Sequence, residues 1–241
     1  LLNAFWESKG VANAEEFRQF SAPVVPLARF SKAVYKNNEQ FTADIEIANY
    51  SSEEINNKNI KWALTNASGQ PLQEGIIPLT NIKIGGGNIA GKISCSLSEV
   101  KKAERLTLRV SIENSSYKNT WNIWVYPATL TIEKEEIVVT DKLTETQKAL
   151  AAGKTVLFNP PYQLCAGLQG KFVPVFWSPV HFPKQAGTMG LLLDPTHKAF
   201  AHFPTEGHTN WQWWSLTTQS RTLVIDSIYQ HITPLVECVD N

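Results

Sequence analysis

Apolar and polar residues alternate along most of the stretch between residues 28 and 127. In the clearest run, from Phe41 to Ile47, aliphatic and aromatic residues alternate with Thr, Asp and Glu. Successive side chains of a strand point to opposite faces, so such a run predicts a strand with one buried face. Strands repeated over about 100 residues indicate a β-sandwich of immunoglobulin type. The same alternation recurs around residues 60–64, 91–97, 106–112 and 121–125.

The composition changes after Pro127, and the rest of the chain has the pattern of an α/β domain. Residues 137–139 are apolar, residues 140–152 have helical spacing, and residues 155–158 are apolar again. A strand, a helix and a strand in close succession are typical of α/β folds. We expect Thr140 or Asp141 to cap the helix and Gly153 to end it. Further apolar runs, which lack alternation, predict strands buried on both faces; they cover residues 191–193, 222–225 and 235–239.

The first 27 residues are expected to form a helical connector from a preceding domain. Asn13 and Glu16 have the spacing of a capping box, and Pro23 and Pro26 end any helix that begins there. The predicted fold class is therefore α+β, in a chain of two domains. A connector over residues 1–27 leads into an immunoglobulin-like β-sandwich over 28–127, which is followed by a small α/β domain over 128–241.

The charges argue against several classes of function. Lys and Arg total 22, Asp and Glu total 22, and the formal net charge is zero. A nucleic-acid-binding protein usually carries a basic excess, so we expect no nucleic-acid partner. No apolar run approaches about 18 residues, so we expect no membrane span. The chain begins with Leu1, and its one methionine is Met189. We therefore expect that Leu1 is not the translation start and that the chain is an excised piece, a processed product, or a sequence that lacks its first residues.

The densest concentration of chemically useful side chains lies between Phe203 and Trp214. Exposed indole rings stack on sugars, while carboxylates, imidazoles and amides reach sugar hydroxyls. The segment is thus a candidate carbohydrate site. The alternative interpretation is a loop whose tryptophans belong to the core, because large aromatic side chains are usually buried. The candidate ligand-binding residues are Trp177, Glu206, His208, Trp211, Trp213 and Trp214.

Other chemistries have weaker sequence support. Neither HExxH nor a pair of cysteines in CxxC spacing occurs, so we expect no metal and no cofactor. Cys165, His208 and Glu206 could form a thiol hydrolase, but Cys165 does not lie in a strained G-x-C-x-G turn. Residues 85–87 are three glycines without the Lys-Ser/Thr of a phosphate-binding loop, so a hairpin turn is expected there.

Several segments resemble one family of enzymes. The sequence LNAFWESKG at residues 2–10, with residues 15–20 and 23–29, resembles the junction that follows the catalytic barrel in bacterial family 2 glycoside hydrolases, the β-galactosidase-like group. Residues 41–49, 62–64 and 121–127 are similar to the immunoglobulin-like accessory domain of those enzymes. Residues 172–177, 187–190 and 203–213 are similar to a glutamine-amidotransferase-like, flavodoxin-like α/β domain.

The resemblance implies that this chain follows a catalytic barrel and holds none of its catalytic glutamates. Active amidotransferases pair an elbow cysteine with a His-x-Glu motif, whereas this chain has the reverse order, Glu206-Gly207-His208. An inactive relative, retained for packing, assembly or sugar contact, is therefore expected. No catalytic residue is assigned.

The leading hypothesis is a non-catalytic C-terminal accessory part of a multidomain glycoside hydrolase, with the upstream barrel as its partner. It would support that barrel and contact carbohydrate, with a homo-oligomer as a further possibility. The alternatives are a stand-alone carbohydrate-binding module that uses the tryptophan-rich loop, and the thiol hydrolase of Cys165 and His208. The resemblance favours a periplasmic or secreted location, and a cytoplasmic location is the alternative.

Overall fold

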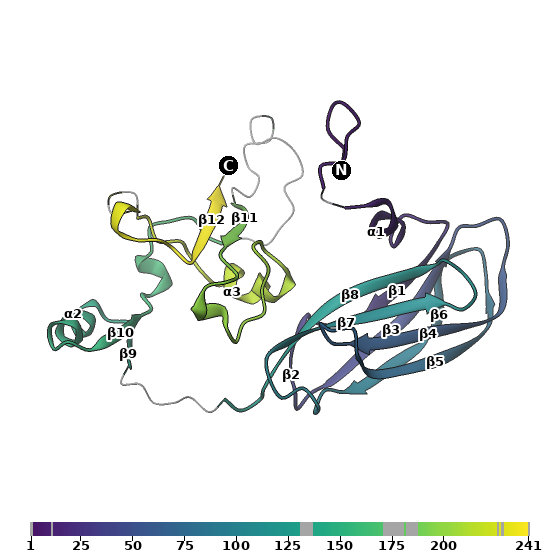
Figure 1. Cartoon of the computed structure of the whole chain (residues 1–241), viewed down its shortest axis with the longest axis horizontal. Helices are drawn as coiled ribbons and strands as arrows, with labels where there is room; N and C mark the ends of the chain where they lie inside the picture. The colour runs from purple at the N-terminus through teal and green to yellow at the C-terminus, as the bar shows by residue number, and fades with distance from the viewer. Residues whose placement is uncertain are drawn as a thin grey trace. The chain divides into compact units, whose positions relative to one another are not determined.

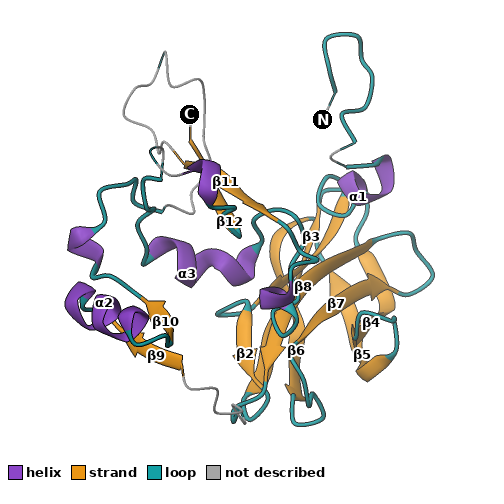
Figure 2. Ribbon diagram, turned by 60° about the vertical axis from the view of Figure 1, so that its left-hand side comes forward, coloured by secondary structure: helices purple, strands orange, loops and turns teal. Residues whose placement is uncertain are grey.

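The alternating stretch of the sequence forms two β-sheets in the computed structural model, which describes residues 2–10, 12–130, 137–170, 181, 188–225, 227 and 229–240. Internal contacts divide the chain into two units, Leu1–Ala128 and Thr129–Asn241. Each unit has its own secondary structure (Figures 1 and 2). A β-rich α+β chain is thus confirmed.

The N-terminal unit consists of a three-stranded and a five-stranded sheet. The first has the order β1 (Val24–Arg29), β3 (Gln40–Asn49), β6 (Gly85–Ser96), and its neighbours are antiparallel. The second has the order β2 (Val34–Lys36), β8 (Lys118–Tyr126), β7 (Glu104–Ile112), β4 (Ile55–Thr65), β5 (Pro71–Ile82). Its pairs are antiparallel except for β2, which runs parallel to β8.

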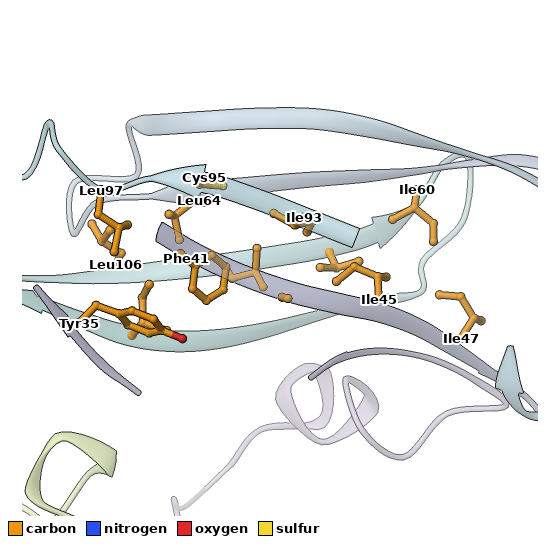
Figure 3. Close-up of a cluster of buried hydrophobic side chains, with 14 of the residues drawn as sticks. Tyr35, Phe41, Ile45, Ile47, Ile60, Leu64, Ile93, Cys95, Leu97 and Leu106 are labelled. Atoms are coloured by element: carbon orange, nitrogen blue, oxygen red, sulfur yellow. The ribbon is translucent and has the colours of Figure 1, made fainter. Parts of the chain in front are cut away.

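One hydrophobic core is built from residues of both sheets, and the alternation in the sequence explains its composition. In β3, Phe41, Ala43, Ile45 and Ile47 are buried, while the residues between them are more exposed. The ring of Phe41 packs edge-on against that of Tyr35, with centroids 5.6 Å apart. Figure 3 shows these side chains with those of the neighbouring strands in a single cluster. The expected strands at 41–47, 60–64, 106–112 and 121–125 lie within β3, β4, β7 and β8, and 91–96 of the one expected at 91–97 lies within β6. The observed strands are longer, and β4 and β6 begin at Ile55 and Gly85.

Two buried asparagines form side-chain hydrogen bonds between segments that are not paired as strands. The amide of Asn119 in β8 donates to the carbonyl oxygen of Pro26 in β1, at 3.0 Å, and so links the two sheets. The amide of Asn49 donates to the carbonyl oxygen of Glu53 at 2.9 Å, and its Oδ1 accepts from the hydroxyl of Ser51 at 2.7 Å. Both side chains are satisfied, as buried polar groups must be.

A short helix, α1 (Ala14–Arg18), precedes the sandwich. The expected capping box is confirmed: Asn13 Oδ1 accepts from the backbone N–H of Glu16 at 2.9 Å, and Glu16 Oε2 accepts from that of Asn13 at 2.8 Å. The helix has five residues, so these two bonds satisfy a large share of its terminal donors.

The C-terminal unit begins with the expected strand, helix and strand. Strand β9 (Ile137–Thr140) pairs in parallel with β10 (Thr155–Phe158), and α2 (Leu143–Ala151) connects them. Gly153 ends the helix with φ of +72°, as predicted. The predicted N-cap is wrong: the cap is Lys142, without a side-chain bond. The hydroxyl of Thr140 instead accepts from the backbone N–H of Lys142 at 3.1 Å and donates to Glu145, because Thr140 still belongs to β9.

The rest of this unit departs from the expected pattern of doubly buried strands. Strand β11 (Thr188–Leu193) pairs antiparallel with β12 (Val236–Asp240), and Leu192 is 54% exposed. Residues 222–225 form no strand, and Leu223 and Val224 are exposed. Apolar character alone cannot distinguish a buried strand from an exposed apolar segment. The remaining elements are short: η1 (Tyr162–Leu164), η2 (Lys198–Phe200), η3 (Trp211–Trp213), α3 (Trp214–Thr218) and η4 (Tyr229–His231).

Candidate functional site

The tryptophan segment, residues 203–214, ends in a 3₁₀ turn that continues directly into α3. Asn210 caps the turn, because its extended backbone allows Oδ1 to accept from the backbone N–H of Gln212 at 3.2 Å. Its amide nitrogen also donates to Oε2 of Glu206. Asn210 therefore fixes both the start of the turn and the position of the Glu206 carboxylate.

The inner side of the segment is packed into the unit. Trp213 is 6% exposed, and its indole N–H donates to the hydroxyl of Thr205 at 2.9 Å. Its ring meets that of Phe203 edge-on, with centroids 4.8 Å apart, and that of Phe200 at 6.1 Å. The amide of the buried Gln212 donates to the carbonyl oxygen of Pro204 at 2.7 Å. Trp213 thus supports the segment from within and does not present a ring face to solvent.

The outer side carries the other two tryptophans. Trp211 is 61% exposed and Trp214 is 50% exposed. Side chains three residues apart in a helical turn leave it on the same side. The two indoles therefore flank one outward surface, whose support is the buried pair Gln212 and Trp213.

His208 lies beside β11 at the edge of this segment. The backbone of Leu193 donates to the carbonyl oxygen of Gly207 at 3.2 Å, and that of Leu191 to the hydroxyl of Thr209 at 2.6 Å. Nδ1 of His208 lies 3.1 Å from the carbonyl oxygen of Thr209, and because a carbonyl oxygen can only accept, Nδ1 carries the proton in this contact. The exposed imidazole of His208 is then oriented with Nε2 as its acceptor when the ring is neutral.

A cavity of about 190 Å³ lies behind the segment. The buried hydroxyl of Thr217 is at its wall and has no hydrogen-bond partner within the described part of the chain. Arg221, also at the wall, donates to the carbonyl oxygen of Cys165 at 3.2 Å and lies over the ring of Tyr162, 5.1 Å from its centroid. Sequence reasoning missed both Thr217 and Arg221. The signal for Arg221 was that no other Arg or Lys occurs between residues 199 and 241.

In the described part of the chain, no hydrogen bond joins the side chains of Cys165 and His208. Cys165 is buried, and its Sγ donates to the carbonyl oxygen of Pro161 at 3.8 Å. A nucleophile needs its base within hydrogen-bond reach. Within the described residues, the hydrogen bonds of Cys165 are with Pro161, Tyr162 and Arg221, and the ring of His208 bonds to Thr209.

The remaining sequence candidates are distributed as follows. Trp177 lies outside the described residues. His197 has a structural position, because its Nδ1 accepts from the backbone N–H of Ala199 at 3.1 Å and so begins a 3₁₀ turn. Among the residues that the structure describes, no three His, Cys, Asp or Glu side chains are grouped to hold a metal ion. In the same residues, no helix is long and apolar enough to cross a membrane.

Two family models each match part of the chain. Residues 39–127 match a domain of unknown function, DUF8488, and residues 138–241 match another, DUF8487. No curated protein matches the chain.

Three of the solved structures that resemble this chain do so at low identity and low TM-score. A CARDB domain from Pyrococcus furiosus, crystallised with di-metal ions, is 6% identical at a TM-score of 0.33, over 43% of this chain and 93% of its own. The alkylpurine DNA glycosylase AlkC of Pseudomonas fluorescens is 10% identical at 0.32, over 44% of this chain and 31% of its own. A β-glucuronidase from Parabacteroides merdae is 11% identical at 0.29, over 42% of this chain and 13% of its own. The chain thus spans less than a third of either enzyme.

Proposed function

We propose that this chain is a non-catalytic accessory part of a multidomain glycoside hydrolase and that its tryptophan segment contacts carbohydrate. The observation that carries the proposal is the division of the segment into two sides. Trp211 and Trp214 are exposed on one side, and Trp213 is buried and hydrogen-bonded beneath them. An indole held in place from below loses little freedom on binding, which favours stacking on a sugar ring.

The polar groups around the two indoles suit the same ligand. The carboxylate of Glu206 is held by Asn210, and the exposed imidazole of His208 is oriented by Thr209. Carboxylates and imidazoles hydrogen-bond to hydroxyl groups, which sugars supply in quantity. The absence of catalysis is part of the proposal, because the paired carboxylates of a glycosidase must flank one bond, and the segment supplies one carboxylate, Glu206.

The topology of the N-terminal unit supports the finer fold assignment that we propose with this function. In an immunoglobulin-like sandwich, the first, second and fifth strands share one sheet, and the third, sixth and seventh share the other. Here β1, β3 and β6 form one sheet, and β4, β7 and β8 lie side by side in the other. For the C-terminal unit, the parallel pair β9 and β10 with α2 is consistent with a flavodoxin-like domain. The upstream barrel as partner and a periplasmic or secreted location are proposed on the sequence resemblance alone.

The test is binding of soluble oligosaccharides to the full chain, measured by calorimetry with gluco-, xylo-, manno- and galacto-hexaoses. We expect at least one to bind, and Trp211→Ala and Trp214→Ala each to weaken binding about tenfold, which corresponds to about 1.4 kcal/mol. Trp6→Ala is the matched control, because Trp6 is 83% exposed but lies in the other unit. Failure of all four sugars to bind, or equal binding by the Trp211 and Trp214 variants, would refute the sugar-contacting role.

A further inference from the structure

The N-terminal unit has a second candidate site, on the outer face of its five-stranded sheet. A groove of about 630 Å³ runs between α1 and strands β4, β7 and β8. Figure 2 shows α1 beside this sandwich. The wall carries four cationic side chains and two carboxylates: Arg18, Lys61, Arg109, Lys118, Glu15 and Glu113. Hydroxyl and amide groups of the turn between β7 and β8 complete it.

Two contacts hold α1 over the sheet and so define the groove. Oε1 of Gln19 accepts from the hydroxyl of Thr120 at 2.7 Å, and Glu15 pairs with Lys118. Residues 15 and 19 share one face of a helical turn, and residues 118 and 120 share one face of a strand. Glu15 and Gln19 are therefore spaced to meet Lys118 and Thr120 at the same time. Arg18, on the same helix, also lines the groove.

The charges of the groove do not cancel. Glu113 lies 2.8 Å from Nζ of Lys61 and also accepts from the amide of Asn59 at 2.8 Å, while Glu15 is bound to Lys118. Each carboxylate is thus matched with a lysine. Within residues 2–130 that the structure describes, the guanidinium groups of Arg18 and Arg109 make no hydrogen bond or ion pair, so their N–H donors can bind a ligand.

The ion pairs also keep the two carboxylates charged. Hydrogen bonds from Lys61 and Asn59 lower the pKa of Glu113. The bond from Lys118 lowers the pKa of Glu15, and the charge of Arg109 adds to this effect. The wall therefore carries two more cationic side chains than carboxylates.

We propose that this groove binds an acidic oligosaccharide through a carboxylate or sulfate group held by Arg18 and Arg109. The planar fork of a guanidinium matches the paired oxygens of such groups. A single inorganic anion would leave most of the groove empty, whereas a short sugar chain fills it and presents hydroxyls to Ser111, Ser115 and Asn114. A nucleic acid is disfavoured because the chain as a whole has no net charge. The site is independent of the tryptophan segment.

The test uses the full chain and four probes in calorimetry at low salt. Tetragalacturonate supplies carboxylates, and a carrageenan tetrasaccharide supplies sulfate without carboxylate. Galactotetraose is the neutral comparison, and single-stranded oligothymidylate is the nucleic-acid comparison. We expect one or both acidic sugars to bind and the neutral sugar to bind at least tenfold more weakly. Which of the two binds more tightly identifies the anionic group.

Variants then assign the binding to the groove. Arg109→Gln and Arg18→Gln should each weaken binding about tenfold or more, since each removes a charge-assisted hydrogen bond. Both arginines are exposed, so these variants should keep the thermal midpoint of the parent. Lys92→Gln is the charge-matched control, because Lys92 is an exposed lysine of the other sheet. Trp211→Ala should also leave this binding unchanged, which separates it from the proposal above.

Several results would overturn this inference. They are equal binding of galactotetraose, tighter binding of oligothymidylate, no binding of either acidic sugar, or acidic-sugar binding that Arg109→Gln and Arg18→Gln both leave intact.

Discussion

At the scale of single residues, two buried threonines of the C-terminal unit differ in one respect: within the described residues, the hydroxyl of one is hydrogen-bonded and that of the other is not. The hydroxyl of Thr146 in α2 donates to the carbonyl oxygen of Lys142 at 3.1 Å. The hydroxyl of Thr217 in α3 is buried and has no partner in the described part of the chain. Both side chains are 7% exposed. Since a buried polar group without a partner costs roughly 1–3 kcal/mol, Thr217 is a local source of instability.

We therefore predict that Thr217→Val raises the free energy of unfolding by about 1 kcal/mol. Valine keeps nearly the same shape and removes the unpaired hydroxyl. The matched control, Thr146→Val, should lower the free energy of unfolding by about 1 kcal/mol because it removes a hydrogen bond that is made. Urea denaturation of both variants checks this. Loss of stability in Thr217→Val would mean that the hydroxyl is satisfied, by a ligand or water in the adjoining cavity.

At the scale of elements, the connection between α2 and β10 depends on one glycine. Gly153 has φ of +72°, and the chain turns there so that the backbone of Lys154 donates to the carbonyl oxygen of Ala149 at 3.0 Å. A residue with a Cβ is strained in this left-handed region. Because α2 ends here, the chain can continue into β10, which pairs in parallel with β9.

We expect Gly153→Ala to lower the free energy of unfolding by about 1 kcal/mol. Space is not the reason, because a Cβ at this position would meet no atom within 4 Å. Gly207→Ala is the control: its φ lies outside the left-handed region, and its Cβ would make ordinary contacts of 3.6 Å or more. Chemical denaturation that shows equal stability for both variants would contradict the assignment of strain to Gly153.

At the scale of the whole molecule, exposed ion pairs set the response to acid. Interactions with neighbouring cations or hydrogen-bond donors lower the pKa of Glu39 and of five other carboxyl groups. The unfolded chain therefore takes up protons before the folded one as the pH falls. The stabilisation is present above the ordinary value of 4.5 for Glu and is lost as the pH falls through the lower folded pKa values. The other groups are Glu15, Glu46, Glu113, Glu145 and Asp194.

The expected result is a thermal midpoint that falls steadily between pH 5 and pH 3. Because the pairs are solvent-exposed, 0.5 M salt should reduce this dependence. Glu39→Gln should reduce it as well, since Glu39 accepts from both Lys32 and the backbone of Lys36. Scanning calorimetry across this range checks the prediction, and a midpoint that rises on acidification would contradict it.

The sequence by itself determined the strands of the sandwich, because alternation is a local property. The run from Phe41 to Ile47 needs no distant information to show which face is buried. The capping box at Asn13 and the glycine at 153 are equally local. By contrast, the apolar residues 222–225 were predicted to form a strand, and they form none. The prediction was wrong because apolar composition alone does not show whether other elements cover a segment.

Only the tertiary structure decided which tryptophans face outward and where charged groups meet. Trp211, Trp213 and Trp214 have the same chemistry, and their roles diverge because Phe203 and Thr205 enclose the middle one. The groove depends on Glu15 meeting Lys118, a pair 103 residues apart in the chain. Burial of a side chain and ion pairing between distant residues depend on how segments far apart in the sequence pack. The local spacing of residues does not determine that packing.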